Sequence, residues 1–212
     1  MKFYLDITLL PDADIALGFL WEKVYQQLHL ALAGNKITEH ESAIGVSFPK
    51  YGDKPFPLGD KLRLFAQTEA QLQQFDVGKW LNRLTDYTHC TSIRAVPPNV
   101  DGFVCFKRKQ FKSASKLEAD IERRALYQSQ KENRPIEEVR AGLIAQKYDG
   151  KCDLPFVYMT SLSSSDDGVP SDRKKFRLFI EKVAVEKAQT GTFNCYGLSS
   201  RDPDKQATVP WF

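Results

Sequence analysis

The order in which hydrophobic periodicity changes along residues 2–96 constrains the fold more than any other feature of the chain. Period-two alternation of apolar and polar residues indicates a half-buried strand, whereas recurrence at three and four residues indicates a helix packed on one face. The expected segments are strand 2–9, helix 12–33, strands 42–48 and 61–67, a helix after a Thr68 cap with a possible break at Gly78, and strand 91–96. This βαββαβ order predicts a ferredoxin-like (RRM-like) antiparallel sheet with two helices on one face.

The rhythm changes after Pro97 and Pro98. The remaining segments are a basic alternating segment at 103–112, a helix opened by a Ser115-x-x-Glu118 capping box, a helix after Pro135, and strands at 155–161, 175–185 and 192–199. We therefore expect an α+β protein of two domains. These are a ferredoxin-like domain over 1–98 and an α+β domain over 99–212 with a basic helix and a small antiparallel sheet.

Composition excludes several classes of protein. The 212 residues carry a formal net charge of only +3, which excludes a histone-like polycation, and 42% hydrophobic residues are typical of a globular protein. The apolar runs are too short to span a membrane, and acidic residues at 6, 12 and 14 argue against a signal peptide. The four cysteines show no C-x-x-C spacing, so we expect reduced thiols and a cytoplasmic location.

The small net charge hides a local basic surplus. Between Lys107 and Arg134 the chain has nine basic and four acidic residues. Strand alternation would place Arg108, Gln110 and Lys112 on one side, where Arg and Gln two residues apart can contact adjacent base edges. Such a surplus suits phosphate binding, although a solvated charged face is the alternative interpretation.

Among the three histidines, at 29, 40 and 89, His29 is the best candidate for chemistry near neutral pH. It follows Leu28 on the first expected helix and lies about 100° from the apolar stripe, beside Tyr25 at the edge of the buried face. A half-buried packing histidine is the alternative. His89 and Cys90 could pair on a metal, but two ligands without neighbouring partners make a weak site, so we expect no metal and no cofactor.

Several segments together resemble the type I-F CRISPR-associated endoribonucleases, which cut precursor CRISPR RNA. The segments that carry the resemblance are FYLDITLLPD, QLHLAL, IGVSFP, the basic strand with Arg108 and Gln110, LPFVYMTS, FRLFI, CYGLS and the terminal VPWF. The resemblance implies metal-independent cleavage of a repeat hairpin at its 3′ foot. In this reaction a ribose 2′-hydroxyl attacks the scissile phosphate and leaves a cyclic phosphate and a 5′-hydroxyl.

The resemblance also implies roles for individual residues. His29 would be the general base, Tyr196 would orient the base or the phosphate, and Ser161 and Ser163 would hold the 2′-hydroxyl. Phe176 would stack on a base, and Arg108 and Gln110 would contact bases near the foot of the hairpin. The remaining RNA contacts expected on the basic strand and helix are Lys109, Lys112, Lys116, Arg123 and Arg124. The helix sequence SKLEADIERRAL carries fewer arginines than the family pattern.

The implied partners are the CRISPR repeat hairpin, the mature CRISPR RNA that the protein keeps after cutting, and the other subunits of the type I-F surveillance complex, without a membrane. The alternative function is a non-catalytic subunit that binds an RNA hairpin within a ribonucleoprotein. Loss of cleavage with retained binding on substitution of His29 would separate the two hypotheses.

Overall fold

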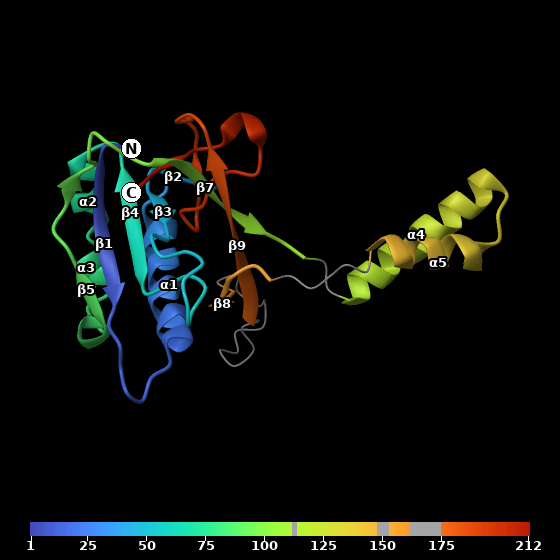
Figure 1. Ribbon diagram of the computed structural model, residues 1–212, viewed down its shortest axis with the longest axis horizontal. Helices are drawn as coiled ribbons and strands as arrows, with labels where there is room; N and C mark the ends of the chain where they lie inside the picture. The colour runs from blue at the N-terminus through green and yellow to red at the C-terminus, as the bar shows by residue number, and fades with distance from the viewer. Residues whose placement is uncertain (112–113, 148–152, 162–174) are drawn as a thin grey trace. The chain divides into compact units, whose positions relative to one another are not determined.

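The computed structural model describes residues 1–111, 114–147, 153–161 and 175–212 (Figure 1). Contacts divide the chain into two compact units, residues 1–109 with 155–212, and residues 110–154. The predicted domains, 1–98 and 99–212, follow chain order instead and stay a prediction. The elements of the first unit are β1 (Phe3–Leu9), α1 (Leu17–Gly34), β2 (Glu41–Ser42), β3 (Gly45–Ser47), β4 (Lys61–Ala66), α2 (Glu69–Phe75), α3 (Val77–Trp80), β5 (Thr88–Cys90), β6 (Arg94–Ala95), β7 (Gly102–Lys109), β8 (Phe156–Thr160), β9 (Lys175–Val185), β10 (Phe193–Asn194) and β11 (Val209–Trp211).

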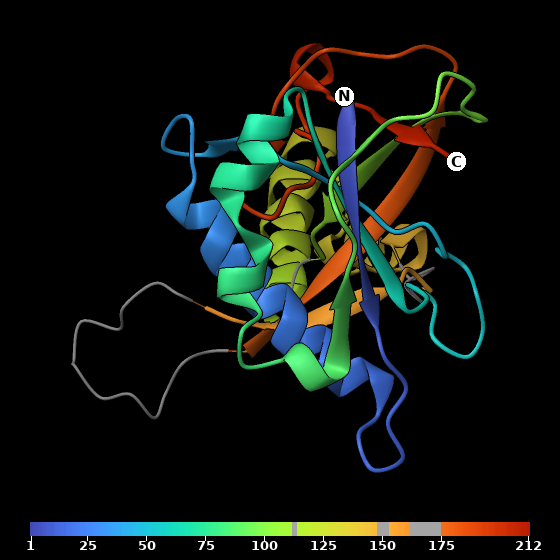
Figure 2. The same cartoon turned by 90° about the vertical axis from the view of Figure 1, so that its left-hand side faces the viewer.

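The first sheet has the strand order β3-β4-β1-β5, with β6 also paired to β1, and every pairing is antiparallel. Helices α1 and α2 lie on the same face of this sheet (Figure 2). In this order β1 lies inside the sheet, and β3 and β4, which the 48–60 connection joins, lie together at one side. The predicted α+β class is confirmed, and this strand order is the one expected of a ferredoxin-like βαββαβ unit.

The helix boundaries differ from the sequence expectation at two points. Helix α1 begins at Leu17 rather than at residue 12, because the Asp12 carboxylate accepts hydrogen bonds from backbone N–H groups at 14 and 15 and forms a turn. The predicted Thr68 cap of α2 is confirmed, and a reciprocal contact from the Gln71 side chain completes a capping box. The break after α2 falls at Asp76, which adopts a left-handed conformation with φ of 44°, and not at Gly78.

Several expected strands are shorter than predicted. The 42–48 segment is divided between β2 and β3, and the 91–96 segment retains only Arg94–Ala95, with β5 preceding it. Only Phe193–Asn194 of the 192–199 segment is a strand, since the rest forms a turn. Strand β7 ends at Lys109, so Gln110 does not share a strand face with Arg108 as predicted.

A second antiparallel sheet has the order β11-β7-β9-β8. Its longest strand, β9, matches the predicted 175–185 segment and pairs with β7 so that Arg108 lies opposite Ile180. The edge strand β8 packs against α1. Strand β10 pairs with β2 in a separate two-stranded sheet, which joins the C-terminal chain to the segment that follows α1. The second sheet and α1 therefore share one core.

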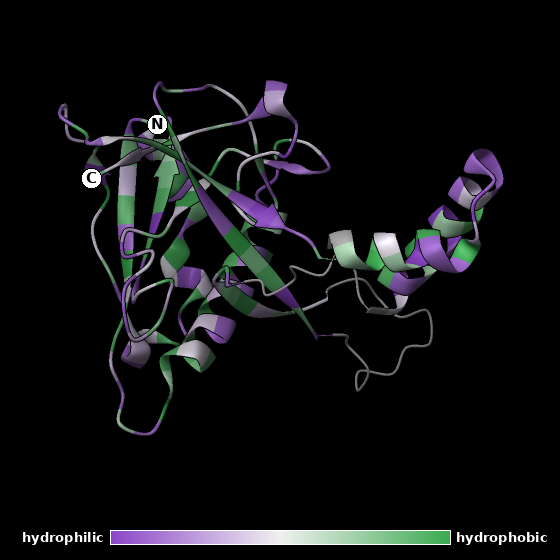
Figure 3. Cartoon of the chain, turned by 45° about the vertical axis from the view of Figure 1, so that its right-hand side comes forward, coloured by the Kyte–Doolittle hydropathy of each residue, from purple (hydrophilic) through white to green (hydrophobic). Residues whose placement is uncertain are grey.

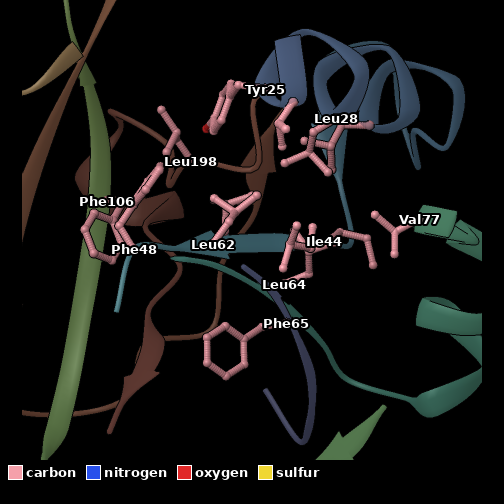
Figure 4. Packing of buried hydrophobic residues seen from close by; sticks show 14 of the residues in the cluster. Tyr25, Leu28, Ile44, Phe48, Leu62, Leu64, Phe65, Val77, Phe106 and Leu198 are labelled. Atoms are coloured by element: carbon pink, nitrogen blue, oxygen red, sulfur yellow. The ribbon is translucent and has the colours of Figure 1, made fainter. Parts of the chain in front are cut away.

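This core contains large aromatic side chains from both sheets and from α1. Trp21, Tyr25, Phe48 and Phe106 are almost completely buried, and Figure 4 shows Phe48 beside Phe106 and Leu198 near Tyr25. The Phe48 and Phe106 rings meet edge to face with centroids 5.1 Å apart. Because α1 is buried from several sides, its register relative to the second sheet is fixed by packing.

A charged pair is buried beside the last residue of the chain. The Arg63 guanidinium donates to both carboxylate oxygens of Asp6 at 2.6 and 3.1 Å and to the Phe212 backbone oxygen at 3.0 Å. It also lies 4.0 Å from the Phe212 ring centroid and 4.7 Å from that of Tyr4. These contacts fasten the end of β11 to the first sheet.

The second unit contains helices α4 (Ala114–Glu132) and α5 (Ile136–Lys147), which pack against each other. Ile121 and Ala125 of α4 and Val139 of α5 are buried, whereas most other side chains of the two helices are exposed. Figure 3 shows hydrophilic and hydrophobic residues mixed along both helices. Because α4 begins at Ala114, Ser115 lies inside the helix rather than at the predicted cap. In the described parts of both units, no helix has the length and apolar content needed to cross a bilayer.

Candidate active site

His29 lies at the boundary between α1 and the turn that follows β10. Its ring Nδ1 lies 2.8 Å from the backbone oxygen of Cys195, and the side chain is buried. A carbonyl oxygen can only accept, so Nδ1 carries the proton in this contact. In the neutral imidazole Nε2 is therefore the unprotonated nitrogen, which is the arrangement that a general base requires.

Tyr196 stacks directly on this imidazole. The two ring centroids are 4.3 Å apart and the ring planes differ by 10°. The Tyr25 hydroxyl donates to the Tyr196 backbone oxygen at 2.9 Å, and Asn194 Oδ1 accepts from the Tyr196 N–H at 2.9 Å. The turn is thus held from α1 and from within itself, so the stacked pair is preorganised.

Gly197 allows this turn to approach the first sheet closely. It has φ of 70°, and its backbone oxygen accepts from the Val46 N–H at 2.8 Å. A Cβ at this position would lie 2.3 Å from Val46 Cγ2. A residue without a side chain is therefore required here for both conformation and space.

Arg108 reaches the same site from β7. Its Cζ lies 5.0 Å from the Tyr196 ring centroid and 5.3 Å from that of Phe176 on β9. Its Nε is buried without a hydrogen-bond partner among the described residues. Because an unpaired buried donor is costly, a ligand that supplies an acceptor oxygen here would be favoured.

The environment changes the protonation of both rings. Burial lowers the pKa of His29; the Arg108 charge acts in the same direction, and the hydrogen bond to Cys195 opposes it. Burial raises the pKa of Tyr196, against the effect of Arg108. At neutral pH the imidazole is therefore neutral and the phenol protonated, so one can accept a proton while the other donates a hydrogen bond.

Gln26, one turn before His29 on α1, ties the end of β8 to the site. Its side-chain oxygen accepts from the Thr160 N–H at 2.9 Å, and its side-chain nitrogen donates to the Thr160 backbone oxygen at 3.3 Å. Ser161 follows directly and is half-buried. Lys175, at the start of β9, pairs with Glu22 on the same helix strip at 3.0 Å. Ser163 lies outside the described residues.

The other predicted RNA-binding residues are not all on this face. Lys109 neighbours Arg108 on β7, points to the opposite side of the strand and pairs with Glu181 at 3.4 Å. Arg123 and Arg124 lie on α4 and both contact the buried Asp120 carboxylate, at 2.8 and 3.5 Å. Gln110 and Lys116 also belong to the 110–154 unit, whereas Lys112 lies outside the described residues.

Within the described ranges, no group of three or more His, Cys, Asp or Glu side chains is arranged to hold a metal ion. Tyr25, Gln26 and the Cys195 carbonyl are parts of the site that sequence reasoning did not assign a role. Their signal was weak. Gln26 shares a helix strip with His29 at a spacing of three residues, but a backbone carbonyl leaves no mark in the sequence.

The fold and the site together define a class of α+β protein. In this class a neutral, oriented histidine, His29, lies near a buried arginine donor, Arg108, beside two aromatic rings. Comparison with known proteins gives the particular family. The model of the CRISPR-associated protein family Cas_Csy4 matches residues 4–212. This chain belongs to that family, which confirms the resemblance found in the sequence.

Two relatives match over the full length of both chains. One, "CRISPR-associated endonuclease Cas6/Csy4" from Escherichia coli (strain UTI89 / UPEC), is 33% identical over 213 residues. The other, of the same name from Pseudomonas aeruginosa (strain UCBPP-PA14), is 31% identical over 214 residues. A solved structure described as "An RAMP protein binding different RNA substrates" covers 100% of both chains with 11% identity and a TM-score of 0.36.

Proposed function

We propose that this protein is a CRISPR-associated endoribonuclease that cuts the repeat hairpin of precursor CRISPR RNA without a metal ion. The full-length relatives are named endonucleases of this kind. The observation that carries the proposal for this chain is the hydrogen bond from His29 Nδ1 to the Cys195 carbonyl at 2.8 Å, because it leaves Nε2 free to accept a proton.

In the proposed reaction, His29 Nε2 removes the proton of the ribose 2′-hydroxyl next to the scissile phosphate. The 2′-oxygen forms a bond to phosphorus while the bond from phosphorus to the 5′-oxygen breaks. The leaving 5′-oxygen takes up a proton from water and His29 later returns its proton to solvent, so the products are a 2′,3′-cyclic phosphate and a 5′-hydroxyl. Tyr196 would hold the imidazole by stacking and hold the phosphate through its protonated phenol. Ser161, with Ser163, would hold the 2′-hydroxyl.

Arg108 and Phe176 would grip the RNA beside the scissile bond. The Nε of Arg108, which has no hydrogen-bond partner in the described part of the chain, can donate to a phosphate oxygen or a base edge. A base stacked on the Phe176 ring contributes about 1–3 kcal/mol. Lys116, Arg123 and Arg124, which are exposed on α4, would bind stem phosphates, and Lys109 and Lys112 would do the same. Because Arg123 and Arg124 share the Asp120 carboxylate, part of their charge is already neutralised within the helix.

Substitution of His29 tests the proposal. We expect His29→Ala to lower the single-turnover cleavage rate by about 10²–10⁴-fold while hairpin binding is kept, because only the proton acceptor is removed. His40→Ala is the matched control, since the His40 side chain is 85% exposed and away from these contacts. Cleavage should persist in EDTA and stop when the attacking 2′-hydroxyl is replaced by hydrogen.

Two results would contradict this function. Undiminished cleavage by His29→Ala would leave His29 as a packing residue. Hairpin binding by the wild-type protein without any cleavage would support the alternative, a non-catalytic subunit of a ribonucleoprotein. Mapping of the product ends by mass spectrometry identifies the cyclic phosphate directly. Retention of the product hairpin and association with other subunits of a type I-F complex belong to the same proposal and are measured by co-purification.

A further inference from the structure

A second basic site lies on α1, away from His29. A pocket of about 230 Å³ opens between α1 and the segment from α3 to Leu84. Its lining contains three cationic side chains, Lys23, Lys79 and Arg83, and no carboxylate. A concave surface with this charge favours an anionic ligand.

The cations are largely available to such a ligand. Within the described part of the chain, Lys79 and Arg83 are exposed and pair with no carboxylate. Lys23 is 3.8 Å from Glu22, whose carboxylate is closer to Lys175, at 3.0 Å. Each cation could therefore bind a phosphate without first giving up a strong ion pair.

The rest of the lining suits a nucleotide rather than a simple anion. Trp80 is half-buried and packs against the end of α1 near Gly34, so its ring is held in place. The amide groups of Gln27 and Asn82 also line the pocket and can both donate to and accept from a base edge. An aromatic ring combined with cations is the usual composition of a single-strand binding surface.

The pocket lies within reach of a strand that leaves the proposed cleavage site. At 100° per residue, Lys23 lies ~120° around α1 from His29 and roughly 9 Å away along the axis. The arc between them passes Gln26, whose side chain is hydrogen-bonded to Thr160 of β8, and the exposed Phe19, so a strand would cross this face of α1 beside the end of β8. For a helix about 11 Å across, that arc is roughly 12 Å long, a distance that a few unpaired nucleotides can span.

We propose that this pocket binds the single-stranded RNA 3′ of the scissile bond. The inference rests on the proposed function, in which the cut lies at the 3′ foot of the hairpin, so that the strand 3′ of the scissile bond leaves the site unpaired. An acidic protein segment would also pair with the cations of the pocket. It would not account for the Gln27 and Asn82 amides or for the Trp80 ring, which suit hydrogen bonding to and stacking on a base.

The test compares two RNAs whose attacking 2′-hydroxyl is replaced by hydrogen, so that neither is cut. One ends just after the scissile bond and the other continues as a single-stranded 3′ flank. The wild-type protein should bind the flanked RNA more tightly, on the order of tenfold at 0.1 M salt, with a salt dependence steeper by about 1.4 for two added phosphate contacts. Lys79→Ala/Arg83→Ala should lose this preference and bind the short RNA as before.

Lys187→Ala/Lys205→Ala is the matched control, because it removes the same charge from exposed positions outside the pocket. It should keep the preference for the flank. If the wild type shows no preference, or if the pocket variant keeps it, the proposal is wrong, and an acidic protein segment becomes the occupant to test. Cleavage of the short, unmodified RNA is measured in parallel. Normal cleavage without a flank effect overturns only this inference, whereas absence of cleavage and binding overturns the proposed function as well.

Discussion

Gly197→Ala should destabilise the protein far more than a glycine substitution usually does. Gly197 has φ of 70°, and an added Cβ would lie 2.3 Å from Val46 Cγ2 and 3.1 Å from Val46 Cβ. The turn cannot retreat freely, because the Gly197 backbone oxygen accepts from the Val46 N–H at 2.8 Å. Relief of the clash therefore requires either loss of that hydrogen bond or displacement of β3.

Two contributions add at this position. A left-handed conformation costs a non-glycine residue roughly 1–2 kcal/mol. Insertion of a methyl group into a well-packed site typically costs about 1–3 kcal/mol more. Gly52 provides the matched control, because it has φ of 96° but its Cβ would meet no atom within 4 Å. Gly52→Ala should therefore show only the first contribution, and the two variants should differ by about 1–3 kcal/mol.

Urea denaturation of both variants and of the wild type measures the free energy of unfolding directly. The same preparations are then assayed for single-turnover RNA cleavage under conditions in which all three are folded. Gly197→Ala should also cleave more slowly, because the turn carries the Cys195 carbonyl and Tyr196. Equal losses of stability for Gly197→Ala and Gly52→Ala would refute the reasoning, since the close approach to Val46 would then carry no energy.

Two further predictions concern charged groups. Because the base must be unprotonated and burial lowers the pKa of His29, the single-turnover rate should rise with pH and then level off, with its midpoint below about 6.5, the ordinary histidine value. A midpoint at or above that value, with RNA binding constant over the range, would contradict it. Arg63→Met should lower the free energy of unfolding in urea by about 3–5 kcal/mol, because among the described residues it leaves the buried Asp6 carboxylate with Lys61, at 3.7 Å, as its one remaining cationic partner. Asp6→Asn/Arg63→Met should recover part of this loss, and an unchanged single variant would show that the pair contributes nothing.

The positions of long strands and helices could be predicted from the sequence, because the periodicity of buried apolar residues determines them. The bounds of β9 match the predicted segment Lys175–Val185, and Thr68 caps the start of α2 as predicted. Short elements were not predictable in the same way. The CYGLS segment alternates like a strand, but contacts from Val46, Tyr25 and His29 hold it as a turn, and these partners are remote in sequence.

The candidate site shows the same division. His29 stood out as a titratable residue at the edge of an amphipathic helix and Arg108 as part of the basic strand, and the family resemblance supplied Tyr196 and Phe176. Their convergence comes from packing of α1 against the second sheet, which no local pattern encodes. The predicted alternation of Arg108 and Gln110 was wrong because β7 stops at Lys109, a boundary for which the uniformly basic sequence gives no signal.

The hydrogen bond between His29 and the Cys195 carbonyl joins residues 166 positions apart in the chain. When the ribosome has synthesised the strands of the first sheet, His29 is already part of the nascent chain. The turn with the Cys195 carbonyl, which fixes the tautomer of His29, has not yet been synthesised. In a nascent or prematurely terminated chain, neither tautomer of the His29 imidazole would be favoured by the Cys195 carbonyl, and the stacked Tyr196 ring would be missing. Competence to cut RNA would arise late in biosynthesis, as one of the last events of folding rather than one of the first.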